Sequence, residues 1–109
     1  MAYDEGLVQR MREMIEDQPM LDEKKMFGGA AFMINGNVAC GVVNDELIVR
    51  VGPDLYEKSL KQDHVKVFDF TGRPMQGWIM VQPGGYETDK ALRDWVEKGI
   101  KFALTLPPK

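Results

Sequence analysis

The chain has 109 residues, of which 44% are apolar and 28% are charged, with a formal net charge of −3. This length is near that of a single domain, and the apolar fraction is enough for one hydrophobic core, so we expect one domain over residues 1–109. The mild negative charge argues against direct binding to DNA or RNA, because modules that coat nucleic acid carry an excess of basic residues that neutralises phosphates.

Cysteine content and hydropathy exclude further classes. Cys40 is the single cysteine, which rules out an intramolecular disulfide and a cysteine-based zinc site. The first residues lack a basic region followed by an apolar stretch, so no signal peptide is predicted. No run of about 18 apolar residues occurs, so we predict no membrane span and expect a cytoplasmic protein.

Three segments have the pattern of amphipathic helices. Residues 3–17 carry apolar side chains at spacings of three and four, with Asp4 as the expected N-cap. Pro53 opens a short second helix, since proline is favoured in the first helical turn. A last helix is predicted from the N-cap Thr88 to about Leu104.

The remaining segments predict strands. Residues 26–51 favour a meander of three antiparallel strands, with Asn35-Gly36 in a type I′ turn, and two further strands are expected over 65–71 and 78–82. The charged residues 22–25 are assigned to the connection before the first strand. The order α-β-β-β-α-β-β-α predicts an α+β fold: a single five-stranded antiparallel sheet with helices packed mainly on one face.

The second face of this sheet is expected to be too apolar to stay in contact with water. A sheet with one wet face alternates apolar with polar residues, yet both sides of the later strands carry large apolar groups. We therefore expect this face to be covered, and we predict a protein-interaction surface there. Its expected members, which depend on strand register, are Ile48, Arg50, Phe68, Phe70, Trp78 and Met80.

The glycine pair Gly28-Gly29, which follows Phe27, is unusual inside a predicted strand, and with a two-residue turn Gly29 would lie opposite Val42. One interpretation is a bent strand or a close approach of a helix. The other is a shallow pocket, or a nest of backbone N–H groups that holds an anion together with Arg50 or Arg73.

No catalytic constellation is visible. His64 is the only histidine, so a triad or a histidine-rich metal site lacks partners. Cys40 lies in an apolar strand and is expected to be a small buried hydrophobe. Asp69 is expected inside an apolar strand, where it either forms an ion pair with Arg50 or Arg73 or belongs to a functional site. In the second case it joins the candidate pocket of Phe27, Gly28, Gly29 and Arg73. We predict no catalytic, cofactor-binding or metal-binding residues, and hence no enzyme and no cofactor.

Four motifs occur in order along nearly the whole chain. They are Met26-Phe27-Gly28-Gly29 with Phe32, Leu47-x-x-Arg50-Val51, Gly72-Arg73-Pro74-Met75-x-Gly77-Trp78, and Trp95-Val96-x-x-Gly99-x-x-Phe102-Ala103. Together they resemble the TfoX N-terminal domain family, which forms the first half of bacterial regulators of natural competence, the TfoX or Sxy proteins.

The resemblance implies a small bacterial α+β domain without transferable catalytic residues, here a stand-alone member that lacks the C-terminal helical domain of the longer regulators. We expect a non-enzymatic regulatory module, linked to transcriptional or competence regulation, that contacts another protein or forms a homodimer. An alternative is a small-molecule or anion-binding domain, or an enzyme, that uses Gly28-Gly29 with Arg50 or Arg73. Direct nucleic-acid binding would require a contiguous basic face.

Overall fold

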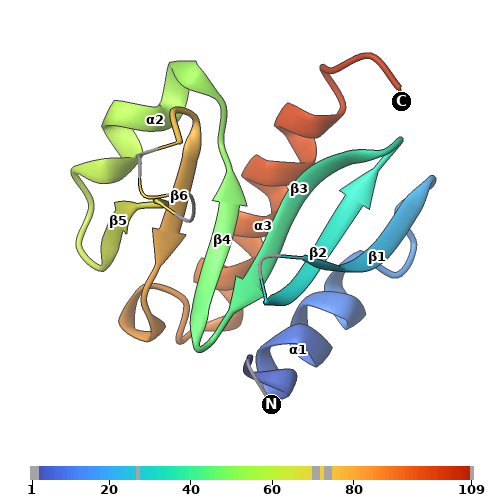
Figure 1. Ribbon diagram of the computed structural model, residues 1–109. Coiled ribbons are helices and arrows are strands. Elements are labelled where there is room, and N and C mark those ends of the chain that lie inside the picture. Colours follow the sequence, from blue (N-terminus) through green and yellow to red (C-terminus); the bar gives the residue numbers. More distant parts are fainter. Residues whose placement is uncertain (1–2, 27, 70–71, 73–74, 109) are drawn as a thin grey trace.

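The computed structural model describes residues 3–26, 28–69, 72 and 75–108. Within them, three α-helices accompany one antiparallel sheet of six strands in the order β1-β2-β3-β4-β6-β5 (Figure 1). The elements along the chain are α1 (Glu5–Ile15), β1 (Leu21–Met26), β2 (Gly29–Ile34), β3 (Asn37–Val43), β4 (Glu46–Arg50), α2 (Pro53–Leu60), β5 (Val65–Val67), β6 (Trp78–Val81), the short 3₁₀ helix η1 (Pro83–Gly85) and α3 (Asp89–Ala103).

The α+β class is confirmed, but the prediction of five strands is wrong, because β1 adds a sixth. It pairs with β2 from Leu21 opposite Ile34 to Met26 opposite Gly29. Its four central residues are charged and exposed. An edge strand that is wet on both faces needs no apolar alternation, and charges along an edge are common in natural sheets. The pattern that signals a half-buried strand is therefore missing from β1.

The strand predicted over 65–71 is shorter than expected. β5 ends at Val67, and the carbonyl of Phe68 instead accepts a hydrogen bond from the N–H of Met75 at 2.9 Å. The chain has thus left the ladder and entered the connection to β6. Phe70, which was assigned to this strand, lies outside the described residues.

The hairpin between β2 and β3 has the predicted turn and an unpredicted bulge. Asn35 and Gly36 have φ values of 54° and 83°, as a type I′ turn requires. Met33 pairs with Val38, but Phe32 pairs with Cys40, which leaves Ala39 without a partner. The bulge shifts the register by one residue, so Ala30, and not Gly29 as predicted, lies opposite Val42.

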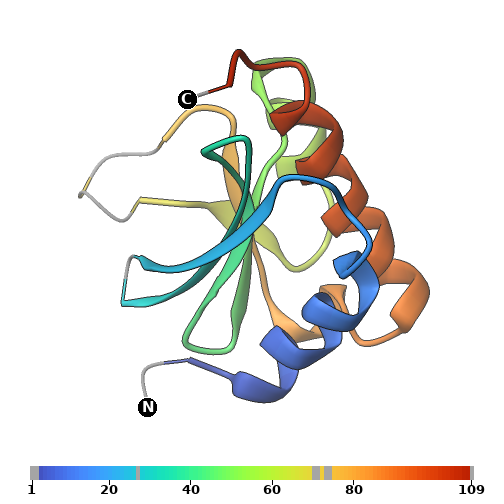
Figure 2. The ribbon, with the colours of Figure 1, turned by 90° about the vertical axis from the view of Figure 1, so that its right-hand side faces the viewer.

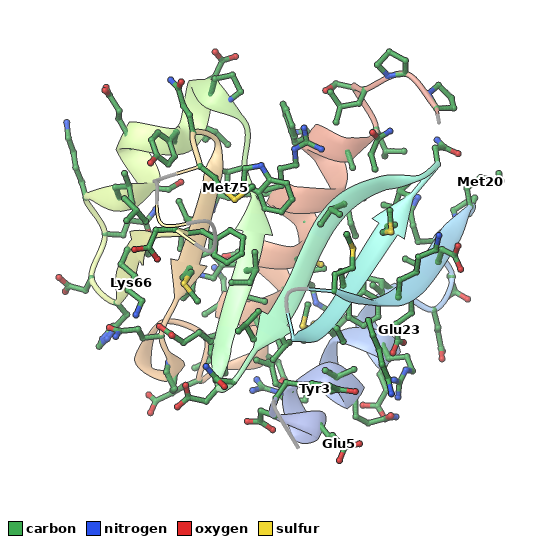
Figure 3. The ribbon with its side chains drawn as sticks, viewed as in Figure 1. Tyr3, Glu5, Met20, Glu23, Lys66 and Met75 are labelled. Atoms are coloured by element: carbon green, nitrogen blue, oxygen red, sulfur yellow. The ribbon has the colours of Figure 1, made fainter. Side chains whose placement is uncertain are left out.

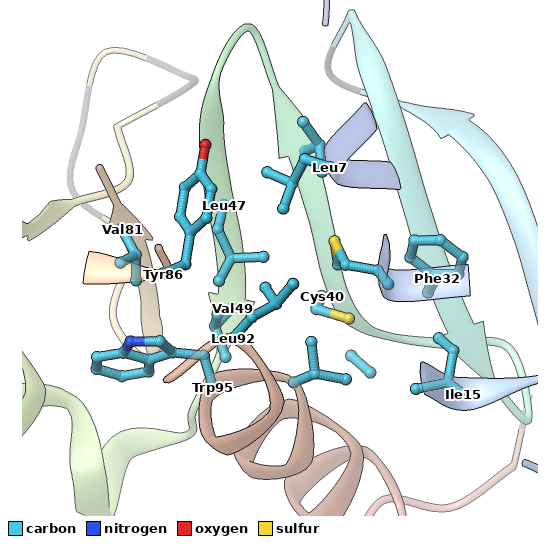
Figure 4. Packing of buried hydrophobic residues seen from close by; sticks show 14 of the residues in the cluster. Leu7, Ile15, Phe32, Cys40, Leu47, Val49, Val81, Tyr86, Leu92 and Trp95 are labelled. Atoms are coloured by element: carbon cyan, nitrogen blue, oxygen red, sulfur yellow. The ribbon is translucent and has the colours of Figure 1, made fainter. Parts of the chain in front are cut away.

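The three helices cover one face of the sheet (Figure 2). The core between them is continuous from α1 across the sheet to α3 (Figure 4). Asp4 and Thr88 cap α1 and α3 as predicted, accepting from the N–H groups of Leu7 and Ala91. Helix α3 approaches β3 so closely that a Cβ at Gly99 would overlap the carbonyl oxygen of Ala39. No helix among the described residues is long and apolar enough to cross a membrane.

A polar seam fixes the entry to α3. The hydroxyl of Tyr86 donates to the carbonyl of Asp45 at 2.5 Å, and the indole N–H of Trp95 donates to the carbonyl of Gly85 at 3.2 Å. Arg10 on α1 donates to the carbonyl of Tyr86 at 3.3 Å. These bonds connect the segment before α3 to the turn between β3 and β4 and to α1.

Candidate interaction face

The second face of the sheet holds a small core of its own. Ile48, Phe68 and Met80 are 1%, 2% and 8% exposed, and Met75 and Trp78 pack against them. Figure 3 shows Met75 lying over this face, which is turned toward the viewer. The expectation that this face is covered is confirmed, and the described cover comes from the connection between β5 and β6.

This burial changes the composition of the predicted interaction surface. Ile48, Phe68 and Met80 are packed inside the chain, so they do not form an open patch, because a surface contact needs accessible atoms. Phe70 lies outside the described residues. Arg50 and Trp78 are only partly buried, and they are the predicted members that reach the surface.

Arg50 lies between two aromatic rings. Its guanidinium carbon is 5.2 Å from the ring centroid of Trp78 and 5.4 Å from that of Phe102. The Trp78 ring in turn lies 5.9 Å from the ring of Phe68. We call these four residues the aromatic–arginine row. Both distances from Arg50 are within the range of a cation–π contact.

Three elements bring the row together. Arg50 is the last residue of β4 and pairs with Trp78, the first residue of β6. Two residues later Gly52 has φ 88°, and its N–H donates to the carbonyl of Gly77 at 3.0 Å. A Cβ at Gly52 would overlap the ring of Phe102, so the glycine makes room for the ring that α3 contributes.

The charge of Arg50 is partly desolvated and is not compensated by an ion pair within the described residues. Burial lowers the pKa of the guanidinium from its ordinary value, although arginine stays charged throughout the physiological range. Among the described residues no ion pair involves Arg50. Two aromatic rings lie within cation–π distance of its guanidinium, and its N–H groups are the donors that a carboxylate would use.

A groove runs beside the row, between the start of α2 and the end of α3. It has a volume of about 530 Å³. Phe102 belongs to both the row and the groove, and Lys98 and Lys101 contribute positive charge. The lining residues are Val51, Gly52, Pro53, Asp54, Leu55, Lys98, Lys101, Phe102 and Thr105.

The Gly28-Gly29 region does not converge with Arg50. A Cβ at Gly29 would overlap the carbonyl oxygen of Val42, so the glycine permits a close approach of the neighbouring strand rather than of a helix. Val43 pairs with Glu46, four residues before Arg50, which puts the two regions roughly 13 Å apart along β4. The prediction of an anion site formed by Gly28-Gly29 together with Arg50 is therefore wrong.

The remaining predicted members of that pocket have different outcomes. Phe27 and Arg73 lie outside the described residues. Asp69 is exposed and follows β5, so its placement inside an apolar strand is wrong. Its carbonyl accepts from the N–H of Gly72 at 2.8 Å, which makes it a turn residue. Among the described residues it forms no ion pair with Arg50.

The potential nucleophile and base are far from reactive geometry. Cys40 is fully buried, and burial raises the pKa of its thiol to about 12, as expected for a structural cysteine. His64 is exposed, with φ 68°, and its ring packs over Gly84. Within the part of the chain that the structure describes, no three His, Cys, Asp or Glu side chains are grouped as metal ligands would be.

Comparison with known proteins places this geometry in a family. A model of the TfoX N-terminal domain matches residues 13–103. The chain belongs to the TfoX N-terminal domain family. A search of curated proteins and a search of solved structures each gave no match. The family match supports a competence-regulator-like module at the level of the family.

The row unites motifs that are far apart in this TfoX N-terminal domain. Arg50, Trp78 and Phe102 come from three of the four motifs that carry the resemblance. The sequence predicted Arg50 and Trp78 as members of the interaction surface, but it named Phe102 only as part of the fourth motif. The available signal was its place three residues after Gly99, in the same motif.

Proposed function

We propose that this TfoX N-terminal domain is a non-enzymatic regulatory module that acts in the cytoplasm by binding another protein. The aromatic–arginine row is the proposed contact. The observation that carries the proposal is the placement of Arg50 between Trp78 and Phe102 without a carboxylate partner among the described residues. In the TfoX and Sxy proteins that the motifs resemble, such a module serves transcriptional control of competence, which we propose as its setting here.

The chemistry of the row suggests what it binds. Arginine and tryptophan are the residues most enriched among those that dominate interface energies. A guanidinium held in contact with two rings has less conformational freedom, so less entropy is lost when it pairs with a carboxylate. The adjoining groove offers apolar surface at Leu55 and Phe102 and positive charge at Lys98 and Lys101. We infer a partner segment that presents a carboxylate beside an apolar side chain.

Quantitative affinity capture from the source organism tests this proposal. Wild type, Arg50→Ala, Arg50→Lys and the control Arg93→Ala are compared, since Arg93 is an exposed arginine on α3, outside the row. We expect a protein that wild type and Arg93→Ala retain equally, with roughly tenfold less retained by Arg50→Ala. Arg50→Lys should also lose binding, because lysine lacks the planar fork.

Direct binding to the purified partner, followed by calorimetry, completes the test. Equal retention of the same proteins by wild type and Arg50→Ala contradicts the proposal. Thermal unfolding of each variant checks that a loss of binding is not caused by unfolding of the domain.

The groove favours one second candidate, an anionic small molecule. Lys98 and Lys101 line it, and Arg50 stacks on Phe102 of its wall. Titration with pyrophosphate, followed by amide chemical shifts, separates the two functions. Saturable shifts at the groove that Lys101→Ala abolishes and Arg93→Ala preserves would support the small anion. Unchanged shifts would leave the protein partner as the function of this surface.

A further inference from the structure

The outer edge of β1 is an open side of the sheet. β1 pairs with β2 on one side, and among the described residues no other strand pairs with it (Figure 1). It is six residues long, twice the length of β5 at the opposite edge. An edge strand of this length presents a row of backbone N–H and C=O groups that can pair with another strand.

The charges along β1 are arranged in two halves. Asp22 and Glu23 occupy the first half, and Lys24 and Lys25 occupy the second. Scattered or like charges on an edge repel a second strand. Here a parallel copy would meet like charges, whereas an antiparallel copy places the acidic half of one strand against the basic half of the other. The strand is therefore complementary to itself in one direction only.

We propose that β1 pairs with β1 of a second copy of this chain, antiparallel, and joins the two six-stranded sheets into one. The two copies are related by a two-fold axis perpendicular to the sheet, at Glu23. This inference concerns a surface other than the aromatic–arginine row and does not depend on the proposed function. It also replaces the second face as the site of the expected homodimer, since that face is largely packed within one chain.

Symmetry limits the possible registers. A two-fold axis perpendicular to the sheet keeps each face on its own side, so directly opposite residues must come from the same face of β1. The axis then passes through either Glu23 or Lys24, if the charged halves are to overlap. With Glu23 on the axis, Asp22 lies opposite Lys24 of the second copy, and Lys24 lies opposite its Asp22.

The ion pairs within one chain select Glu23. The residue on the axis faces its own copy, which brings two like charges together. Glu23 already accepts from Arg12 of α1 at 2.9 and 2.8 Å, so its charge is compensated before the second copy arrives. Lys24 has no ion pair among the described residues, so an axis at Lys24 would oppose two uncompensated charges.

The same register covers an exposed methionine. Met20, which precedes β1, is 70% exposed and stands at the outer end of the strand (Figure 3). Its φ of 61° puts it outside the strand ladder, so with the axis at Glu23 the last pair is Leu21 opposite Lys25 of the second copy. Met20 stands just beyond this pair, near Met26 of the second copy, and the charged pairs lie between these two ends. Apolar contacts at both ends add burial that an all-charged edge would lack.

The interface is small, so we expect a weak and salt-sensitive dimer. Strand pairing alone buries less area than the standard interface of a stable complex. Sedimentation equilibrium of the full chain over roughly 10 to 500 μM should show reversible dimerisation in this range. Raising the salt to about 1 M, where the screening length is near 3 Å, should weaken it.

Charge exchange at two exposed positions gives the decisive test. Asp22→Lys and Lys24→Asp each place like charges opposite one another twice in the dimer, and each should weaken association about tenfold or more. The double variant D22K/K24D restores both pairs and should recover the wild-type constant. The two single variants mixed together should also associate, because each supplies the charge that the other needs.

Lys58→Asp is the matched control, since it makes the same charge change at an exposed position on α2. It should leave association unchanged, and circular dichroism should show all variants folded. A wild type that stays monomeric over the whole range overturns the proposal. A dimer that both single variants preserve overturns it equally, because the contact would then lie elsewhere. Failure of either kind leaves the Arg50 capture experiment unaffected.

Discussion

The two faces of the sheet are both apolar, yet they are built differently. Leu47 and Ile48 are neighbours on β4 and point to opposite faces, and both are almost completely buried. Leu47 lies in the large core beneath the helices, with cover from α1 and α3. Ile48 lies in a cluster of three buried residues, whose described cover comes from the connection between β5 and β6.

Complete burial of a residue therefore does not show how thick the layer of protein that covers it is. On the helix-covered face, regular helices close over a wide core. On the second face, an ion pair between Glu46 and Lys66 (2.9 Å) and the stack at Arg50 lie on either side of the apolar cluster. This face therefore has a small buried apolar cluster in its middle and polar or charged side chains that reach the surface on either side of it.

Truncation at the two neighbouring positions compares the faces directly. Leu47→Ala should lower the free energy of unfolding by about 4 kcal/mol, and Ile48→Ala by about 2.5 kcal/mol, because the shallower cluster can relax into the space. Denaturant unfolding measures both values. Equal losses would mean that the second face is packed as firmly as the first, and a loss below about 1 kcal/mol at Ile48 would mean that it is not a core.

The close approach of α3 to β3 can be broken at Gly99. A methyl group there would overlap the backbone of Ala39, which cannot move without disturbing the sheet. Gly99→Ala should destabilise the fold by about 2 kcal/mol in spite of the better helix propensity of alanine. Gly6→Ala in α1 is the matched control, since its nearest neighbour would be the capping oxygen of Asp4 at 3.2 Å, which needs to move by only a few tenths of an ångström.

The Gly6→Ala control should change the stability by less than about 1 kcal/mol in either direction. Chemical denaturation of both variants checks the pair. A Gly99→Ala variant as stable as wild type would show that the helix can move away from the sheet without loss.

The polar seam on the helix-covered face should contribute less. Tyr86→Phe removes the hydrogen bond to the backbone carbonyl of Asp45 and should cost about 1 kcal/mol in unfolding free energy. Tyr56→Phe is the control, because Tyr56 has no hydrogen bond from its hydroxyl among the described residues. If both variants lose the same unfolding free energy, the loss is caused by the change around the ring and not by the loss of the hydrogen bond.

The reactivity of Cys40 measures how well the core on the helix-covered face excludes thiol reagents. We expect the ionisation of this thiol to have no effect on stability at neutral pH. The thiol pKa of about 12 leaves almost no thiolate at pH 8, so a thiol reagent should react roughly 1000-fold more slowly than with the unfolded chain. The folded pKa is raised, so the unfolded state ionises first, and stability should fall as the pH rises from the ordinary cysteine value toward 12.

Cys40→Ala should remove the contribution of the thiol to that alkaline loss. Rapid labelling of the native protein at pH 8 would contradict the tight packing of this face.

Much of the fold could be predicted because local chemistry determines it. Asp4 and Thr88 cap their helices through a single side-chain oxygen, and Asn35-Gly36 adopts the turn its φ values allow. The strand β1 could not be predicted in this way, because its charged residues are exposed at an edge and only its pairing with β2 makes it a strand.

The site was harder to predict than the fold. The excess of apolar residues revealed the second face but could not separate those that are buried, such as Phe68, from those that reach the surface, such as Trp78. Phe102 lies on a helix that packs against the opposite face, so only the three-dimensional path around Gly52 brings it to Arg50. Contacts of this kind depend on where elements end, which local patterns do not specify.

The bulge at Ala39 has a consequence for how this hairpin can change in length. Removing one residue from a strand normally turns every following side chain to the other face. Ala39, however, is one residue more than the ladder uses, because Val38 and Cys40 already have consecutive partners on β2. Deletion of Ala39 would preserve the orientation of every other residue in β3 and would withdraw the carbonyl that lies against Gly99. The hairpin can thus lose one residue at this position without turning any side chain to the other face of the sheet. Whether a residue larger than glycine fits at position 99 depends on whether Ala39 is present.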